Sequence, residues 1–175
     1  MLRRRRESGF TLIETTIVLG TVTLSTLGVI TAHLTCARLA QTNRETQLAS
    51  QAVRSKMEEV AASDVTQVVG LYDSLPANDP GGAGTGPGAT FAVGGLAPNS
   101  LGATGDVVLP LDGAGHLRED ITDPALGMPR DLNGDGVIDA LDHSADFCIL
   151  PVLVRVRWNG LARDREMRLH TVLYR

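Results

Sequence analysis

The sequence predicts an α+β fold, in which one long N-terminal helix packs on a small antiparallel β-sheet. Three observations carry this prediction. An apolar run extends from residue 10 to residue 34, and a stripe of apolar residues at helical spacing follows it to about residue 62. Two segments with alternating apolar and polar residues, 152–158 and 165–174, lie at the C-terminal end and are typical of paired strands.

The apolar run has the length and composition of a transmembrane helix. As a helix, residues 10–34 extend about 37 Å, which exceeds a hydrocarbon core of about 30 Å. Four arginines at positions 3–6 precede the run, and the positive-inside rule keeps such a basic end in the cytoplasm. We therefore expect a single-pass membrane protein whose chain lies outside the cytoplasm after about residue 35.

The start of the run contains one acidic residue, Glu14, within the sequence Gly-Phe-Thr-Leu-Ile-Glu. A carboxylate at membrane depth costs at least about 2.5 kcal/mol unless it is paired, so it indicates a functional role. An ordinary secretory signal has a shorter apolar core and a small-residue cleavage site, and this segment has neither. The alternative is a signal anchor that contains one glutamate by chance, which the joint occurrence of the basic segment, Gly9, Phe10 and Glu14 disfavours.

This opening resembles the class III leader of type IV prepilins and pseudopilins. The resemblance implies that a prepilin peptidase removes residues 1–9 by cutting after Gly9, and that it methylates the new N-terminal residue, Phe10. It also implies that Glu14 pairs with the N-terminal amine of a neighbouring subunit during assembly. The fold that it implies is pilin-like, with the head in the periplasm and the helix anchored in the inner membrane.

The predicted helix continues beyond the membrane, since it contains neither proline nor glycine between Val29 and Val69. We expect residues 10–35 to form its transmembrane half, residues 36–62 its periplasmic half, and residues 63–175 a small head. The periplasmic half carries an apolar stripe, which more often packs on its own domain than on a partner helix. The stripe consists of Leu39, Thr42, Thr46, Ala49, Val53, Met57 and Val60.

The first part of the head is rich in glycine and proline between residues 76 and 115, which favours long loops with short strands near 90–93 and 106–109. Its glycine-rich string at 81–86 lacks the Lys-Ser/Thr of a phosphate-binding loop. We therefore do not expect nucleotide binding there.

Residues 131–142 have the spacing of a 12-residue calcium-binding loop. Oxygen-bearing side chains occupy the first, third, fifth, ninth and twelfth places, and Gly136 occupies the sixth, where such a loop turns sharply. The Asp at the twelfth place makes the segment similar to the calcium repeats of dockerin domains. A solvated turn of Asp, Asn and Gly residues is the alternative. The expected calcium ligands are Asp131, Asn133, Asp135, the carbonyl of Val137, Asp139 and Asp142.

The C-terminal segments predict a β-hairpin over residues 152–174, with Asn159-Gly160 as the turn signal. Alternation places Val152, Val154, Val156 and Trp158 on one face, and it places Met167, Leu169, Thr171 and Leu173 on one side of the second strand. This ending resembles that of minor pilins and minor pseudopilins of the PilV and GspI type.

Composition restricts the classes of function further. The whole chain has a net charge of −4, and removal of the leader arginines makes it more acidic, so no nucleic-acid surface is expected. No nucleophile motif or histidine pair indicates catalysis, and we expect the protein not to be an enzyme. Cys36 and Cys148 would enter an oxidising space, where sequence alone leaves their pairing open.

These features predict a structural minor pilin or pseudopilin that assembles, through its N-terminal helix, into the priming or tip complex of a type IV pilus or a type II secretion pseudopilus. The expected partners are other pilins or pseudopilins, the prepilin peptidase and the inner membrane. One alternative is a calcium-dependent adhesion or ligand-binding module displayed on a pilus. A membrane-anchored periplasmic enzyme is another, but no residues indicate its activity.

Overall fold

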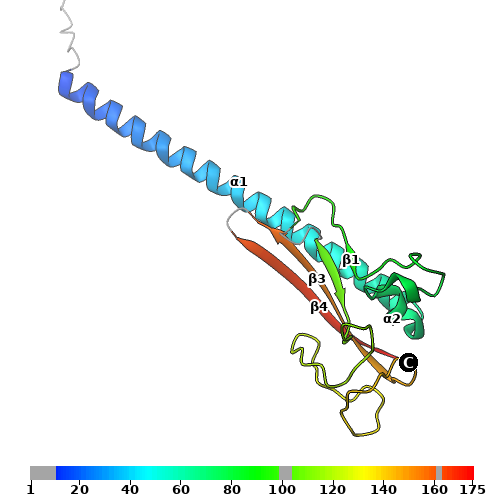
Figure 1. Cartoon of the computed structure of the whole chain (residues 1–175). Helices are drawn as coiled ribbons and strands as arrows, with labels where there is room; N and C mark the ends of the chain where they lie inside the picture. Colours follow the sequence, from blue (N-terminus) through cyan, green and yellow to red (C-terminus); the bar gives the residue numbers. More distant parts are fainter. Residues whose placement is uncertain (1–10, 99–103, 161–162) are drawn as a thin grey trace, which may run out of the picture. The chain divides into compact units, whose positions relative to one another are not determined.

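The computed structural model describes residues 11–98, 104–160 and 163–175 (Figure 1). Its elements are α1 (Leu12–Ala62), α2 (Val65–Tyr72), η1 (Pro76–Asn78), β1 (Thr90–Phe91), β2 (Gly105–Val108), β3 (Ile149–Asn159) and β4 (Asp164–Tyr174). One long helix and a four-stranded antiparallel sheet confirm the predicted α+β class. The chain divides into two compact units, Met1–Thr42 and Asn43–Arg175. From here on the head means the second unit, which includes the C-terminal part of α1 as well as residues 63–175.

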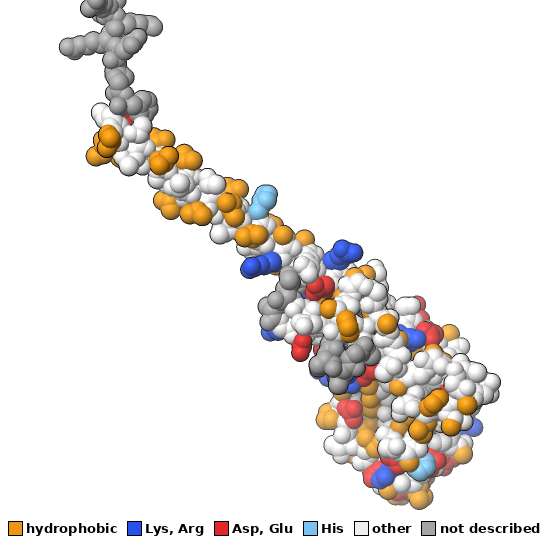
Figure 2. Space-filling model, turned by 45° about the horizontal axis from the view of Figure 1, so that its top comes forward, with side chains coloured by type: hydrophobic (Ala, Val, Ile, Leu, Met, Phe, Trp, Pro, Cys, Tyr) orange, Lys and Arg blue, Asp and Glu red, His pale blue; other side chains and the backbone are white. Residues whose placement is uncertain are grey.

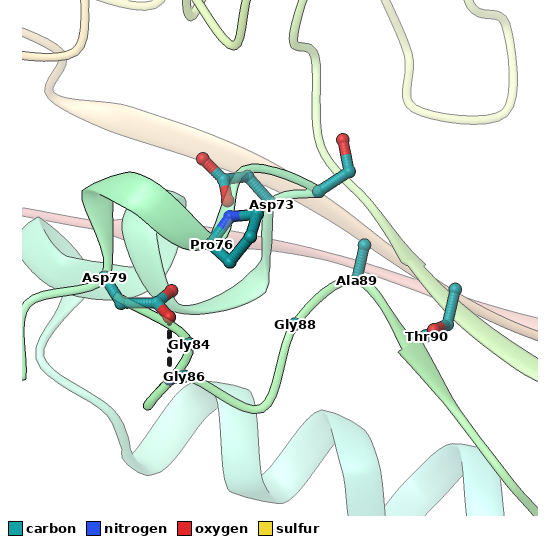
Figure 3. Close-up of a pocket in the computed structure, with 9 residues that line it drawn as sticks. Asp73, Pro76, Asp79, Gly84, Gly86, Gly88, Ala89 and Thr90 are labelled. Atoms are coloured by element: carbon teal, nitrogen blue, oxygen red, sulfur yellow. Dashed lines mark hydrogen bonds between the residues drawn. The ribbon is translucent and has the colours of Figure 1, made fainter. Parts of the chain in front are cut away.

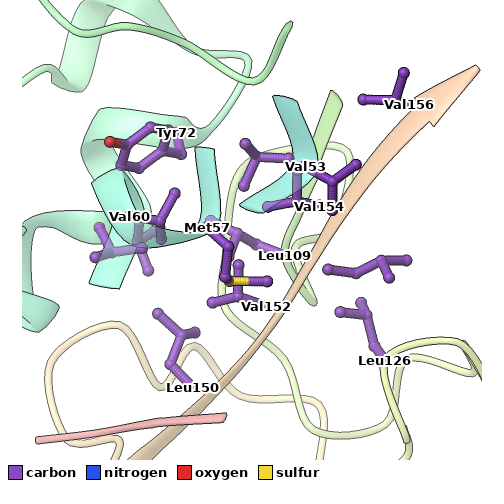
Figure 4. Packing of buried hydrophobic residues seen from close by; sticks show 14 of the residues in the cluster. Val53, Met57, Val60, Tyr72, Leu109, Leu126, Leu150, Val152, Val154 and Val156 are labelled. Carbon is purple, nitrogen blue, oxygen red and sulfur yellow. The ribbon is translucent and has the colours of Figure 1, made fainter. Parts of the chain in front are cut away.

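Helix α1 has the length that the sequence predicts, and it ends at Ala62. The stripe of its C-terminal half is buried in the head from Ala49 onward, whereas Leu39 lies in the first unit and is exposed. Val53 lies beside Val154 and Met57 beside Val152 (Figure 4). The expectation that the stripe packs on its own domain is therefore confirmed for Ala49, Val53, Met57 and Val60.

The sheet has the order β1-β2-β3-β4, and all neighbouring strands are antiparallel. The hairpin of β3 and β4 pairs Val156 with Met167 and Val154 with Leu169, so the predicted faces are correct. The strands are longer than predicted, because β3 begins at Ile149 and β4 at Asp164. The face of β3 that packs toward α1 is apolar and fully buried.

The opposite face of β3 is partly covered. Leu153 is only 1% exposed, and the carbonyl of Leu126 lies 3.1 Å from Nε2 of His170. Leu126 belongs to residues 109–148, which we call the β2–β3 connection. It contains no helix or strand of its own but contributes several buried apolar side chains: Leu109, Leu117, Leu126, Met128, Leu132 and Phe147.

Helix α2 was not predicted from the sequence. Asp64 caps it, since its carboxylate accepts the backbone N–H of Thr66 at 2.9 Å. The helix buries Val68, Val69 and Tyr72 in the head core, and the Tyr72 hydroxyl donates to Glu59 on α1 at 3.1 Å. Two turns of helix are thus fixed by one cap and three buried side chains.

Candidate functional site

The first unit offers a helical surface that is apolar on all sides. One helix near the N-terminus is long and apolar enough to cross a membrane. Every residue from 11 to 40 is exposed in the isolated chain, and large side chains such as Leu12 and Leu24 are 87% and 72% exposed. Hydrophobic side chains gather along this segment in the space-filling view (Figure 2).

The hydroxyl groups of this surface are satisfied within the helix. From Thr15 to Thr35, each donates to a backbone carbonyl three or four residues earlier, as Thr16 does to Leu12 at 2.6 Å and Ser25 to Thr21 at 2.8 Å. Such bonds remove the need for water around a hydroxyl in an apolar environment. The same bond is made by Thr15, Thr21, Thr23, Thr26, Thr31 and Thr35.

Glu14 is different from these hydroxyls. It lies in the first turn of α1, where its negative charge interacts favourably with the helix dipole. Its backbone N–H is bonded to Thr11, but within the described residues its carboxylate makes no hydrogen bond or ion pair. The predicted processing residues, Gly9 and Phe10, lie outside the described residues.

The predicted calcium loop forms a series of tight turns in the head. Both carboxylate oxygens of Asp131 accept backbone N–H groups, from Gly134 at 2.6 Å and from Gly136 at 2.8 Å. Gly136 has a φ of 85°, a conformation that favours glycine at the place where the sequence predicts the sharp turn. Asn133 and Asp135 each accept the N–H two residues further on, at 3.0 and 2.7 Å.

The six predicted ligands separate into different surroundings. Asp142 accepts the hydroxyl of Ser144 and the backbone N–H groups of Ser144 and Leu117, the last two at 3.0 and 3.1 Å. Burial raises the pKa of Asp142, but these hydrogen bonds, the hydroxyl bond first, lower it by more, so it lies below the ordinary value. Asp139 instead lies beside His143 and Glu119. In the part of the chain that the structure describes, Asp139, His143 and Glu119 form the one group of three or more His, Cys, Asp or Glu residues placed to share an ion. Calcium binding by the loop stays a prediction.

Glu119 is fixed by the backbone around it. Two backbone hydrogen bonds hold the segment that contains it. The N–H of Arg130 donates to the carbonyl of Glu119 at 3.1 Å, and the N–H of His143 donates to the carbonyl of Leu117 at 2.8 Å. Its side chain is 0% exposed. One oxygen, Oε1, accepts the N–H groups of Leu132 and Asn133 at 2.6 and 3.2 Å, and the other, Oε2, faces Asp139 and His143.

His143 is only 3% exposed and lies among three carboxylates. Its Nε2 is 3.0 Å from Asp139 and 3.8 Å from Glu119, and its Nδ1 is 3.2 Å from Asp146. Burial lowers the pKa of His143, but the hydrogen bonds with Asp139 and Asp146 and the charge of Glu119 raise it by more, so its pKa lies above the ordinary value. The cluster thus attracts positive charge.

Sequence reasoning missed Glu119 and His143. Glu119 stands between Arg118 and Asp120 and has no local motif, because its side-chain contacts are 13 to 24 residues away. His143 had a usable signal, since it follows Asp139 by four residues and comes directly after the predicted loop.

A cavity of about 270 Å³ lies beside the glycine-rich segment (Figure 3). Its acidic side chains hold the surrounding loops. Asp79 accepts the N–H of Gly86 at 3.0 Å, and Asp73 accepts from Leu75 and Asn78 at 2.9 and 2.6 Å. Two carboxylates at its wall disfavour a phosphate ligand.

The two cysteines, Cys36 and Cys148, are both exposed free thiols, so the structure contains no bridge between them.

The chain matches no family model, no curated protein and no solved structure.

Proposed function

We propose that the protein is a structural subunit of a filament-like assembly, of the minor pilin or pseudopilin kind, anchored in the inner membrane until it is incorporated. The observation that carries the proposal is the first unit. Its helix exposes apolar side chains all round, satisfies its own hydroxyls and keeps one carboxylate, Glu14, without a partner among the described residues. Such a surface suits lipid first and neighbouring helices afterwards.

The pairing of Glu14 gives assembly its selectivity. Cleavage after Gly9 would create a positive amine at Phe10, and the carboxylate lies about one helical turn further on. A neighbouring subunit that brings its own amine to Glu14 neutralises two charges in an apolar environment, where an unpaired charge costs several kcal/mol. Subunits therefore associate side by side at a defined register. The leader peptidase and other subunits of the same kind are the partners, and the head faces the periplasm.

The first test concerns processing. When the full chain is produced with a prepilin peptidase, mass spectrometry should find a chain that starts at Phe10 and carries one added methyl group. Gly9→Val should block this cleavage, because it places a branched side chain directly at the proposed cut. Mature-size protein from the Gly9→Val chain would contradict the leader assignment.

The second test concerns assembly. Glu14→Ala should leave membrane insertion and processing intact but remove the subunit from sheared filaments of the host cell. Glu58→Ala provides the matched control, since Glu58 is an exposed acid on the head part of the same helix. Equal incorporation of the Glu14→Ala and wild-type chains would defeat the proposed pairing.

A second candidate function is a cation-dependent binding module displayed by this subunit. Val137, Ile138 and Leu141 are 57%, 50% and 66% exposed within the predicted calcium loop, so apolar side chains gather on a segment whose shape depends on its acidic residues. Ligand capture by displayed heads that is lost with a chelator, and lost in Ile138→Ser, would favour this function over a purely architectural one. Capture that neither the chelator nor the substitution alters would exclude it.

A further inference from the structure

We propose that the head contains a binding site for one zinc ion, formed by Glu119, Asp139 and His143. The site lies in the β2–β3 connection, away from the helix that assembly uses, and it rests on residues that the 12-residue calcium pattern does not include, apart from Asp139. It therefore goes beyond the proposed function.

The distances within the cluster suit a tetrahedral ion. Zinc binds nitrogen and carboxylate oxygen at about 2.0–2.2 Å, so two of its ligands lie about 3.3 Å apart. The Nε2 atom of His143 is 3.0 Å from Oδ1 of Asp139 and 3.8 Å from Oε2 of Glu119, and these values bracket that separation. One ligand atom from each of the three residues lies within 4.8 Å of the others. Side-chain movements that bring the three ligand atoms to about 3.3 Å from one another would complete the geometry.

The ligands are held by an outer shell of hydrogen bonds. A histidine that binds a metal usually donates its other ring N–H to a carboxylate or carbonyl, and Nδ1 of His143 lies 3.2 Å from Oδ1 of Asp146. Glu119 is oriented in the same way. Its Oε1 accepts two backbone N–H groups, so that Oε2 is turned toward the other ligands.

The charge of the cluster favours a divalent cation. Glu119 is fully buried, and burial of a carboxylate is costly unless a positive charge compensates it. Within residues 11–98, 104–160 and 163–175, no lysine or arginine forms an ion pair with Glu119, Asp139 or Asp146. A protonated His143 supplies one positive charge against these three carboxylates. Zinc would displace the proton from Nε2 to solvent and supply two.

The donor set distinguishes zinc from calcium. Calcium requires six to eight oxygen ligands, whereas this cluster offers one imidazole nitrogen and two carboxylates. Asp139 is the most exposed of the three, with 33% of its side chain accessible, so water can occupy the remaining position on its side. The ion would link Glu119 to a loop 20 residues away in a segment that has no regular secondary structure. Its role would be to stabilise the fold of the head.

The test is a zinc titration of the full chain in detergent after a chelator has removed bound metals. Competition with a chromophoric chelator should give one zinc per chain, and cobalt(II) in its place should show the visible absorption of a tetrahedral site. Asp146→Asn should weaken zinc binding about 10- to 100-fold through the loss of the outer shell. His143→Gln and Glu119→Gln should weaken it further. His116→Gln is the matched control, because His116 is exposed and its ring pairs with Asp112, which lies outside the cluster.

Several results would overturn the site. These are the absence of stoichiometric zinc binding, an unchanged affinity in both Asp146→Asn and His143→Gln, or binding of calcium alone with dependence on Asp131 and Asp135. Asp146 keeps the test decisive if Glu119→Gln fails to fold, since the Asp146 side chain is 57% exposed and its substitution leaves the core intact. Leader processing, measured on the same chains, is independent of zinc, so failure of one proposal is distinguishable from failure of the other.

Discussion

Residues 12–42 and the β2–β3 connection satisfy their polar groups in opposite ways. In the helix the hydroxyls from Thr15 to Thr35 donate to carbonyls one turn earlier, and the apolar side chains remain exposed. In the connection the important bonds join distant residues, as between Glu119 and the backbone of Leu132, and apolar side chains such as Phe147 are buried. The first region leaves its apolar surface uncovered, whereas the second buries its apolar side chains within its own chain.

The largest expected effect comes from removing a large buried side chain of the connection. Phe147 is 1% exposed, and Phe147→Ala should lower the free energy of unfolding of the head by about 3–5 kcal/mol through lost burial and a residual cavity. Urea unfolding in detergent measures it, because the single tryptophan, Trp158, is buried in the head and reports its unfolding by fluorescence.

The matching change in the first region is Leu24→Ala. Leu24 is 72% exposed in the isolated chain, so this substitution should leave the Trp158 transition unchanged. An equal loss of stability in both variants would show that the two units unfold together, which would break the contrast between them.

Glycine positions provide a second comparison of intermediate size. A Cβ added at Gly105 on β2 would overlap the ring of Phe91, so Gly105→Ala must displace that ring from the sheet. We expect a loss of about 1–3 kcal/mol in the urea experiment. A Cβ at Gly28 meets nothing within 4 Å, and Gly28→Ala should leave the head transition unaltered. A Gly105→Ala head as stable as wild type would mean that Phe91 contributes little to packing.

The same contrast explains how much the sequence could predict. Helix α1 and the β3–β4 hairpin depend on periodicity, which a single segment displays by itself, and both were predicted with nearly correct bounds. The two short strands near 90 and 106 were also placed correctly, because apolar patches stand out in a glycine-rich segment. Helix α2 was missed, since its eight residues follow α1 after only two and their pattern merges with that of α1.

The cation cluster marks the limit of sequence reasoning. The calcium pattern was found because its ligands are local, and the structure uses the same residues for local turns and for contacts with Leu117, Glu119 and His143. Glu119 was missed because nothing nearby in sequence distinguishes it from a surface acid. Glu119 lies beside His143 because the β2–β3 connection comes back to this segment at two points. Arg130 donates its N–H to the carbonyl of Glu119, and His143 donates its N–H to the carbonyl of Leu117.

The smallest expected effect comes from removing the cap of α2, a local hydrogen bond between Asp64 and Thr66 in the head. The hydrogen bonds of the Asp64 carboxylate with the side chain and backbone of Thr66 lower the pKa of Asp64, and the folded state therefore favours its ionised form. This contribution to stability is present above the unfolded pKa of about 3.9 and is lost as the pH falls through the lower folded pKa. Asp64→Ala should therefore destabilise the head slightly at neutral pH, and the difference in unfolding free energy between this variant and wild type should shrink in acid.

Asp64→Asn is the control. It keeps an acceptor for the N–H of Thr66, so its unfolding free energy should be closer to that of wild type at neutral pH and should show no such pH dependence. A difference between wild type and Asp64→Ala that grows as the pH falls would show that the carboxylate acts in the unfolded chain, or through another group, and not as a cap of α2.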